Sequence, residues 1–289
     1  MMSDKLVIES HFVPELDSSS RLSDYLGGVF KTISSRKGMK KAIDKSLVLL
    51  NGKMASTADF VSGGETIELL ENLSQNRPEI ELKLEVLFED EHLAIIHKPA
   101  GIEVSGNKRW TIANALSSNL IRSTESDALK FPEPIHRLDY PTSGVLLIGK
   151  TASAVTALNQ LFEHRMVKKT YYAVTIGEME LNRDIRLPVD GKPSYSTFSV
   201  LYTIESERFG CLNLVELHPH TGRRHQLRKH LSEIGNPILG DRDYGLEGLI
   251  LNGKGLYLHA SSLHFIHPRT KTEISIRAEL PKKFKKLFP

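Results

Sequence analysis

Cysteine is almost absent from this chain: Cys211 is the single one among 289 residues. No internal disulfide can therefore form, and no multi-cysteine zinc site exists. Apolar runs of the roughly 20 residues that a membrane-spanning helix needs are also missing, and the first ten residues contain no apolar core typical of an export signal. These absences exclude a disulfide-stapled secreted protein, a collagen, a coiled coil and a membrane protein, and they predict a cytoplasmic globular protein.

A strong excess of one charge is missing as well, because 38 Lys and Arg stand against 35 Asp and Glu, a net charge of +3. Such a balance does not by itself indicate a nucleic-acid binder. What is present is the composition of an ordinary globular protein, with 40% hydrophobic and 25% charged residues. Residues 71–81 are polar, contain Pro78 and show little periodicity. We therefore expect a small domain over residues 18–71, a linker over 72–81 and a large domain over 82–289.

The small domain is expected to combine helices with a hairpin. Leu22, Leu26 and Phe30 recur at a spacing of four behind three serines, which predicts a capped helix. A second helix and two short strands with Asn-Gly and Gly-Gly turn signals are expected over 37–45, 48–53 and 61–70. This order is typical of a small α+β unit.

Basic residues crowd the second of these helices. Lys37, Lys40 and Lys41 lie at offsets of three and four, so a helix would present them on one side. A solvated helix face explains such a charge run, and charge alone favours that interpretation. A phosphate-binding face is the alternative.

The large domain alternates strands with a few helices. Strands are expected over 84–90, 93–98, 144–150, 170–176, 197–204, 211–217 and 256–266. Helices are expected over 151–168, with Thr151 as the cap, and over 223–234, with Gly235 after the end. Because most strands are not separated by crossover helices, we predict an α+β fold with a mixed, largely antiparallel sheet and flanking helices.

One polar segment, HRLDYPTSG over residues 136–144, runs directly into a buried strand. It carries Asp139 in a turn stiffened by Pro141. An Asp in such a turn usually bonds its own backbone. The alternative is a functional carboxylate held at the lip of the sheet.

A second polar segment, TGRRHQLRKHL over residues 221–231, opens the expected late helix. Arg223 and Arg224 fall in its first turn, where the helix dipole disfavours cations. Arg223 also falls near the apolar face, where an unpaired charge is costly. We therefore expect a carboxylate, a phosphate or both to meet this end of the helix.

Two further features of the sequence leave alternatives open. The histidines of residues 218–230 raise the possibility of a metal site, but neighbouring Arg and Lys repel a cation and no carboxylate lies within the segment. Tyr171 and Tyr172 are ordinary strand aromatics or site residues. They point to opposite faces of a strand, so at most one of them lines a site.

Five segments together resemble one family, the RluA-type pseudouridine synthases. HRLDYPTSGVLLIGKT resembles the catalytic-aspartate segment of that family, and TGRRHQLRKHL with the following GNPILGDRDYG resembles a late segment. HKPAG, KTYYA and LHASSLHFIHPRT resemble its early Lys-Pro segment, its tyrosine segment and its closing strand, all in the family's order. RLSDYL and VLLNGK, in the small domain, are similar to the RNA-binding domain named after ribosomal protein S-four.

The resemblance implies an isomerase that converts uridine in RNA to pseudouridine. The base leaves C1′ through N1 and returns through C5, so no atoms are lost and no cofactor is needed. The resemblance implies that Asp139 is the catalytic carboxylate, which either attacks C1′ or assists proton removal from C2′. It also implies that Arg228 pairs with Asp139 and that Tyr171 stacks on the uracil, with assistance to proton transfer at C5 as a further role.

The partner implied by the resemblance is structured RNA, from which the target base must be flipped out. Arg137 is then the candidate to fill the vacated stack or to hold the displaced strand. The other expected RNA contacts are His136, Arg223, Arg224, Lys229, Lys37, Lys40, Lys41, Lys98 and the lysines of residues 282–286. No metal is expected, and a monomer is the expected state.

Tyr140 and Pro141 depart from the acidic or polar pair that usually follows the catalytic Asp, and His97 stands where Asn is common. These departures bear on which RNA is recognised. Large-subunit ribosomal RNA is the first choice of target and transfer RNA the second. A catalytically silent RNA-binding protein and a histidine-dependent metalloenzyme are the competing interpretations.

Overall fold

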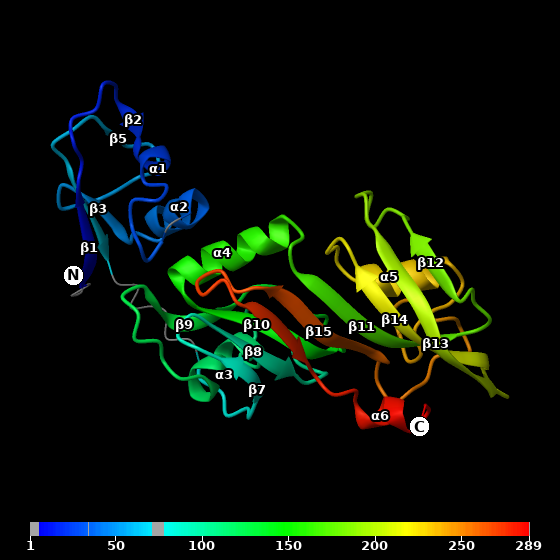
Figure 1. Ribbon diagram of the computed structural model, residues 1–289. Helices are drawn as coiled ribbons and strands as arrows, with labels where there is room; N and C mark the ends of the chain where they lie inside the picture. Colours follow the sequence, from blue (N-terminus) through cyan, green and yellow to red (C-terminus); the bar gives the residue numbers. More distant parts are fainter. Residues whose placement is uncertain (1–5, 34, 71–77, 289) are drawn as a thin grey trace.

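The computed structural model describes residues 6–33, 35–70 and 78–288 (Figure 1). The small unit contains β1 (Val7–Phe12), β2 (Ser20–Arg21), α1 (Leu22–Tyr25), α2 (Arg36–Asp44), β3 (Val48–Leu50), β4 (Lys53–Met54), β5 (Phe60–Val61) and β6 (Thr66–Leu70). Four of the strands form a sheet in the order β1-β6-β3-β4, and β2 pairs with β5. The predicted α+β character of this unit is confirmed.

The small unit has its own core and starts earlier than predicted. Leu22, Leu26 and Phe30 are buried in this core as expected, but α1 contains only four residues. β1 pairs with β6, and Val13 belongs to the core, so the boundary at residue 18 is wrong. The Asn-Gly turn between β3 and β4 is confirmed, since both of its residues have positive φ, as a tight hairpin requires.

The large unit is built on one ten-stranded sheet in the order β12-β13-β14-β11-β15-β10-β8-β7, with β16 beside β15 and β9 beside β10. Its strands are β7 (Glu85–Glu89), β8 (Leu93–Lys98), β9 (Ala128–Pro134), β10 (Ser143–Thr151), β11 (Lys168–Ile176), β12 (Asn182–Ile185), β13 (Ser196–Ser206), β14 (Gly210–Pro219), β15 (Leu258–Ile266) and β16 (Glu273–Arg277). The pairs are antiparallel except β10 with β15. The predicted mixed, largely antiparallel sheet is confirmed.

Four helices accompany this sheet: α3 (Ile112–Asn119), α4 (Ala152–Glu163), α5 (Gln226–Glu233) and α6 (Lys282–Lys285). The helix α3 packs against β9, α4 against β10 and α5 against β14. Thr151 caps α4 as predicted, with its hydroxyl accepting a hydrogen bond from the Ala154 N–H. Among the described residues, no helix is both long and apolar enough to cross a membrane.

Part of the predicted linker belongs to the large unit. Residues 71–77 lie outside the described residues, so the linker prediction there stays a prediction. Ile80 is 4% exposed and packs in the core beneath β8 and β10, so the large unit begins before residue 82.

Two hydrophobic cores divide the large unit. One gathers around β8 and β10 and includes Leu138, and the other gathers around β11 and β14 and includes Leu227. The strands β10 and β15 join the two halves through a short parallel contact, Ser143 beside His259 and Gly144 beside Ala260. A Cβ at Gly144 would lie 2.0 Å from the Ala260 carbonyl oxygen, so only glycine allows this approach.

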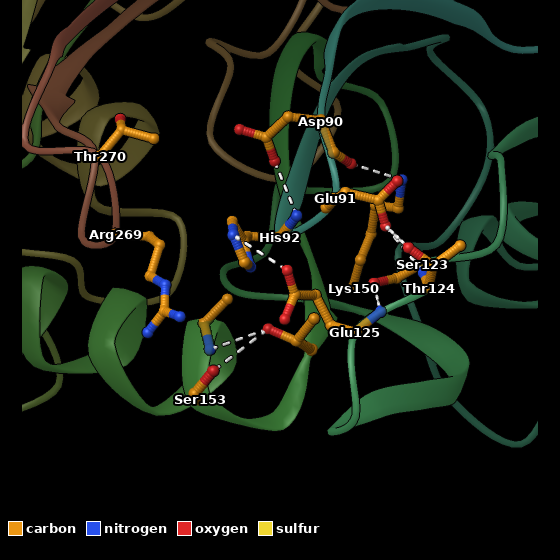
Figure 2. A network of polar contacts seen from close by, with 12 residues as sticks. Asp90, Glu91, His92, Ser123, Thr124, Glu125, Lys150, Ser153, Arg269 and Thr270 are labelled. Carbon is orange, nitrogen blue, oxygen red and sulfur yellow. Dashed lines mark hydrogen bonds and ion pairs between the residues drawn. The ribbon is translucent and has the colours of Figure 1, made fainter.

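A network of polar contacts holds the far end of β10 (Figure 2). The buried Lys150 ammonium contacts the Glu89 carboxylate at 2.7 Å and the Asp90 carbonyl at 2.5 Å. The Asp90 carboxylate accepts hydrogen bonds from the His92 and Leu93 N–H groups, which closes the turn between β7 and β8. This network fixes one end of β10 while the loop before β10 carries the candidate site.

Candidate active site

Asp139 lies in the loop between β9 and β10, at the lip of the sheet. Its side chain is 16% exposed, and its carbonyl accepts a hydrogen bond from the Thr142 N–H at 3.0 Å, which closes a turn. Two cavities meet at this residue, of about 330 Å³ and 770 Å³. The carboxylate is thus near solvent and bordered by open space, as a reactive group must be.

Lys98 supports this loop from inside the protein. Its ammonium donates hydrogen bonds to the carbonyls of Thr142 at 2.7 Å, Pro99 at 3.0 Å and Tyr140 at 3.4 Å. The side chain is completely buried, and burial lowers the pKa of Lys98 to about 8 against the opposing effect of the Asp139 charge. The prediction that Lys98 contacts RNA is therefore wrong, because a buried ammonium cannot reach a phosphate.

Arg228 comes from α5, in the other half of the sheet, and its Nη1 lies 3.9 Å from the Asp139 Oδ2. The predicted proximity is present, but Asp139 is not the main partner. Asp241 accepts two hydrogen bonds from Arg228 at 2.7 and 2.6 Å, and Asp243 accepts one at 2.7 Å. Burial lowers the pKa of Arg228, but these three carboxylates outweigh burial and raise it.

The role of Asp241 was not predicted from the GDRDYG segment that contains it. Asp241 is 1% exposed, and its two bonds aim the guanidinium toward Asp139. The only signal in the sequence was a pair of carboxylates, Asp241 and Asp243, separated by one residue. Neither composition nor periodicity says which arginine such a pair will hold.

His225 is a second neighbour of Asp139 that the sequence analysis did not single out. Its Nε2 lies 3.7 Å from the Asp139 Oδ1, and its Nδ1 lies 2.9 Å from the Tyr244 hydroxyl. Burial lowers the pKa of His225, with the charges of Arg228 and Arg224 acting in the same direction. A neutral ring that accepts the Tyr244 proton at Nδ1 carries its own proton on Nε2, facing Asp139.

Tyr171, on β11, lines the smaller cavity together with Asp139. Burial, with the Asp139 charge in addition, raises the pKa of Tyr171, so the phenol stays protonated. The neighbouring Tyr172 instead donates a hydrogen bond to Glu216 at 2.9 Å. As predicted, only one of the two tyrosines lines a site.

His136 also lines the smaller cavity, but as a neutral ring. Burial, together with the Lys169 charge, lowers its pKa to about 3. Its Nε2 accepts a hydrogen bond from the Leu147 N–H at 3.1 Å, and its ring stacks on Phe162. His136 can therefore contact RNA only as a neutral ring, without adding positive charge.

The arginines at the start of TGRRHQLRKHL lie in a loop, because α5 begins at Gln226 and not at Arg223 as predicted. Arg223 is exposed and donates to the Pro193 carbonyl at 3.3 Å, so the expectation that it points to the apolar face is wrong. The Gln226 side chain accepts hydrogen bonds from the Thr221 hydroxyl and the Arg223 N–H. Arg137 and Arg224 are exposed on the cavity walls, as RNA contacts require.

The remaining basic residues differ in their availability. Lys37, Lys40 and Lys41 are exposed on α2, whose Met39, Ala42 and Ile43 are buried. Lys229 is paired with Asp190 at 2.5 Å. Among the tail lysines, Lys283 is held by the Leu256 carbonyl at 2.6 Å, and burial lowers its pKa to about 8.

The clustered histidines have separate structural partners. His218 contacts Glu216 at 3.0 Å, the His220 ring stacks on Tyr195, and His230 contacts the Leu187 carbonyl at 2.9 Å. Within residues 6–33, 35–70 and 78–288, no group of three or more His, Cys, Asp or Glu side chains is arranged to hold a metal ion. Hydrogen bonding and stacking thus account for the density of histidine in this segment.

Comparison with known proteins gives the arrangement a family. Residues 92–233, which include Asp139, Tyr171 and Arg228, match the family model described as RNA pseudouridylate synthase. Ribosomal large subunit pseudouridine synthase D of Xanthomonas campestris pv. campestris is 31% identical, over 96% of this chain and 90% of its own length. The chain belongs to the RNA pseudouridylate synthase family. The family resemblance predicted from the five segments is thereby confirmed, while the S-four-like nature of the small domain stays a prediction.

Other members of the family extend the match. Ribosomal large subunit pseudouridine synthase C of Pasteurella multocida is 34% identical, over 72% of this chain and 68% of its own length. The solved structure of Human RNA Pseudouridylate Synthase Domain Containing 4 aligns with a TM-score of 0.55 at 26% identity, over 70% of this chain and 90% of that one. The fold found here is thus that of known family members.

Proposed function

We propose that this protein is an isomerase that converts a specific uridine to pseudouridine in large-subunit ribosomal RNA, with Asp139 as its catalytic carboxylate. One observation carries the proposal: Asp139, Tyr171 and Arg228, which are far apart in the sequence, meet at one cavity. The family membership supports the reaction. The relatives that cover most of the chain are named as ribosomal large subunit enzymes, which supports the target.

Asp139 has the surroundings that either chemical route needs. Attack on C1′ and assistance in proton removal from C2′ both use an ionised carboxylate in a site with little bulk water. Arg228 supplies a positive charge 3.9 Å from one carboxylate oxygen, and the His225 Nε2 lies 3.7 Å from the other. The rearrangement keeps every atom of the nucleotide, so the proposal includes no cofactor and no metal.

Tyr171 supplies a flat wall for the uracil. It stays a phenol, because its pKa is raised, so it stacks on the base or donates a hydrogen bond and does not act as a phenolate base. Leu227 and Leu258 line the same cavity and provide an apolar surface for the ring. A volume of about 330 Å³ accommodates a single flipped base.

RNA is held outside this cavity by the exposed cations. Arg137 and Arg224 stand on its wall, and Arg137 is the group that takes the place of the flipped base. The small unit, with Lys37, Lys40 and Lys41 on one exposed face of α2, acts as the S-four-like RNA-binding domain. The proposal describes a monomer that acts in the cytoplasm.

Mapping of pseudouridine across cellular RNA, with and without this gene, tests the reaction and the target together. One position in large-subunit ribosomal RNA should lose its modification when the gene is absent. A lost position in transfer RNA would keep the reaction and replace the target. If every pseudouridine is still present without the gene, and the purified protein binds RNA, the protein is a catalytically silent RNA-binding protein.

The Asp139→Asn variant tests the assignment of the catalytic group. The purified variant should form no pseudouridine, because an amide is neither a nucleophile nor a base in this reaction. It should bind the same RNA with nearly the affinity of the wild type, since Asp139 is not a phosphate contact. Filter binding and a tritium-release assay on [5-³H]uridine RNA measure the two properties, and retained turnover would refute the assignment.

A further inference from the structure

The larger of the two cavities at Asp139 is not needed for the uracil. It has a volume of about 770 Å³, and it shares Arg137, Asp139 and Arg224 with the smaller one. An RNA strand whose target nucleotide lies in the smaller cavity would therefore place a neighbouring nucleotide at the larger cavity. The walls of the larger cavity indicate what it can bind.

Tyr140 is an exposed aromatic residue on this wall, next to Asp139 in the chain. Its side chain remains 56% exposed although a tyrosine ring usually gains stability from burial. Its backbone is fixed by the Gly101 N–H, which donates to its carbonyl at 2.8 Å, and by the buried Lys98. The following Pro141 restricts Tyr140 to extended conformations. The ring is therefore displayed at the cavity by a rigid support.

Three exposed arginines of the cavity are available to an anion. The acids of the lining already have cationic neighbours: Glu103 is paired with Lys108 at 2.7 Å, Asp241 and Asp243 are bonded to Arg228, and the Arg228 Nη1 lies 3.9 Å from the Asp139 Oδ2. In contrast, no carboxylate of the described residues forms an ion pair with Arg137, Arg224 or Arg242, all of which line the cavity and are exposed. A ligand with a flat ring and a phosphate can stack on the Tyr140 ring and accept hydrogen bonds from these arginines.

We propose that Tyr140 stacks on the base of a nucleotide next to the target uridine, whose phosphate is bound by Arg224 and Arg242. This inference rests on the proposed function and adds a second base-binding subsite to it. Since every base has a π face, the contact recognises an unstacked neighbour more than its identity.

A double-perturbation cycle tests the subsite. The RNA is an oligonucleotide of the stem-loop that contains the mapped uridine, prepared intact and with an abasic residue on the 5′ or the 3′ side of that uridine. All proteins in this cycle carry Asp139→Asn, so that the RNA stays unconverted. Dissociation constants are measured for this parent protein and for the parent with Tyr140→Ala or Tyr140→Phe. Tyr202→Ala, which removes a 65% exposed tyrosine from β13 outside both cavities, is the matched control.

Tyr140→Ala should weaken binding of the intact RNA by about 5-fold to 150-fold, the range that corresponds to removal of one base–aromatic stack. Tyr140→Phe and Tyr202→Ala should bind the RNA as the parent protein does. The parent should bind one of the two abasic RNAs more weakly than the intact RNA, by the same factor as Tyr140→Ala. On that abasic RNA, Tyr140→Ala should cause no further loss of affinity. An equal effect of Tyr140→Ala on all three RNAs, or none beyond that of Tyr202→Ala, would overturn the subsite.

The two failures are distinguishable. If the wild type forms no pseudouridine in any RNA, the proposed function fails before the cycle begins. If the wild type modifies its uridine and the cycle shows no coupling, the subsite alone fails.

Discussion

Arg228 shows how one buried residue joins stability to function. Its guanidinium is 3% exposed and contacts Asp241 with two hydrogen bonds while it faces Asp139. Lysine would keep the charge but lose the fork that spans these partners. Arg228→Lys should lower the unfolding free energy by about 2 kcal/mol and turnover by more than about tenfold.

Urea unfolding and single-turnover kinetics measure both effects. Asp243→Asn is the control, because this partner of Arg228 is 60% exposed and an exposed pair contributes about 0 to 1 kcal/mol. If Arg228→Lys is no worse than Asp243→Asn, the fork does not hold the site together.

The lowered pKa of His136 should make the stability of the protein depend on pH. Its pKa in the folded protein is about 3, against an ordinary value of 6.5. Between these values the unfolded chain binds a proton that the folded protein does not, so stability falls as the pH is lowered from 6.5 toward 3. The slope from this one group approaches about 1.4 kcal/mol per pH unit.

His136→Gln should therefore flatten the acid side of the stability curve. Chemical unfolding of both proteins at several pH values measures the difference between them, which cancels the contributions of the other buried histidines. Parallel curves for the two proteins would contradict a neutral His136.

At the scale of elements, the contact between β10 and β15 depends on Gly144. Its φ is +125°, and a Cβ would meet the Ala260 backbone at 2.0 to 2.7 Å. Gly144→Ala should therefore cost about 3 kcal/mol or more, as overpacking and backbone strain combine. Gly235→Ala is the matched control, since its φ is +87° but nothing lies within 4 Å, and it should cost only about 1 to 2 kcal/mol.

Thermal unfolding of the two variants measures this difference. Equal losses would mean that the strands separate to admit the methyl group. The short parallel contact would then not be a rigid junction.

The elements that could be predicted from the sequence are those whose burial is continuous or periodic. The strands β8 and β10 each contain a continuous apolar run, residues 93–96 and 145–148, and α4 carries both a cap and a regular stripe. The strand β16 was missed although Ile274 and Ile276 alternate with polar residues. The strands β1 and β12 were missed because they are largely exposed. Such strands are stabilised by their partners in the sheet, which local patterns do not reveal.

The start of α5 was misplaced for a related reason. His225 has a positive φ of 55°, so the helix cannot include it, and the Gln226 side chain bonds the loop before it. The candidate residues Asp139, Tyr171 and Arg228 could be named from motifs. Their geometry depends on Asp241, His225 and Lys98, whose roles arise only from contacts between distant segments.

At the scale of the whole molecule, the small unit has a separate sheet and a separate hydrophobic core. Deletion of residues 1–75 should therefore leave the large unit folded, with a cooperative thermal transition. RNA binding should weaken, or the choice of target should change, because the exposed lysines of α2 are removed. Circular dichroism, affinity measurements and pseudouridine mapping follow the three properties, and unchanged affinity and target would show that the small unit does not bind RNA.

The order of the site residues along the chain determines when the site can form during translation. Asp139 is translated before Arg228, and both cores include residues of the late strand β15, while Tyr171 packs against both cores. A nascent chain that ends before α5 carries Asp139 without Arg228 and without the part of the cavity wall that Leu227 and Leu258 form. The site can therefore form only after α5 and Asp241 have been translated, and a fragment that lacks them should form no pseudouridine.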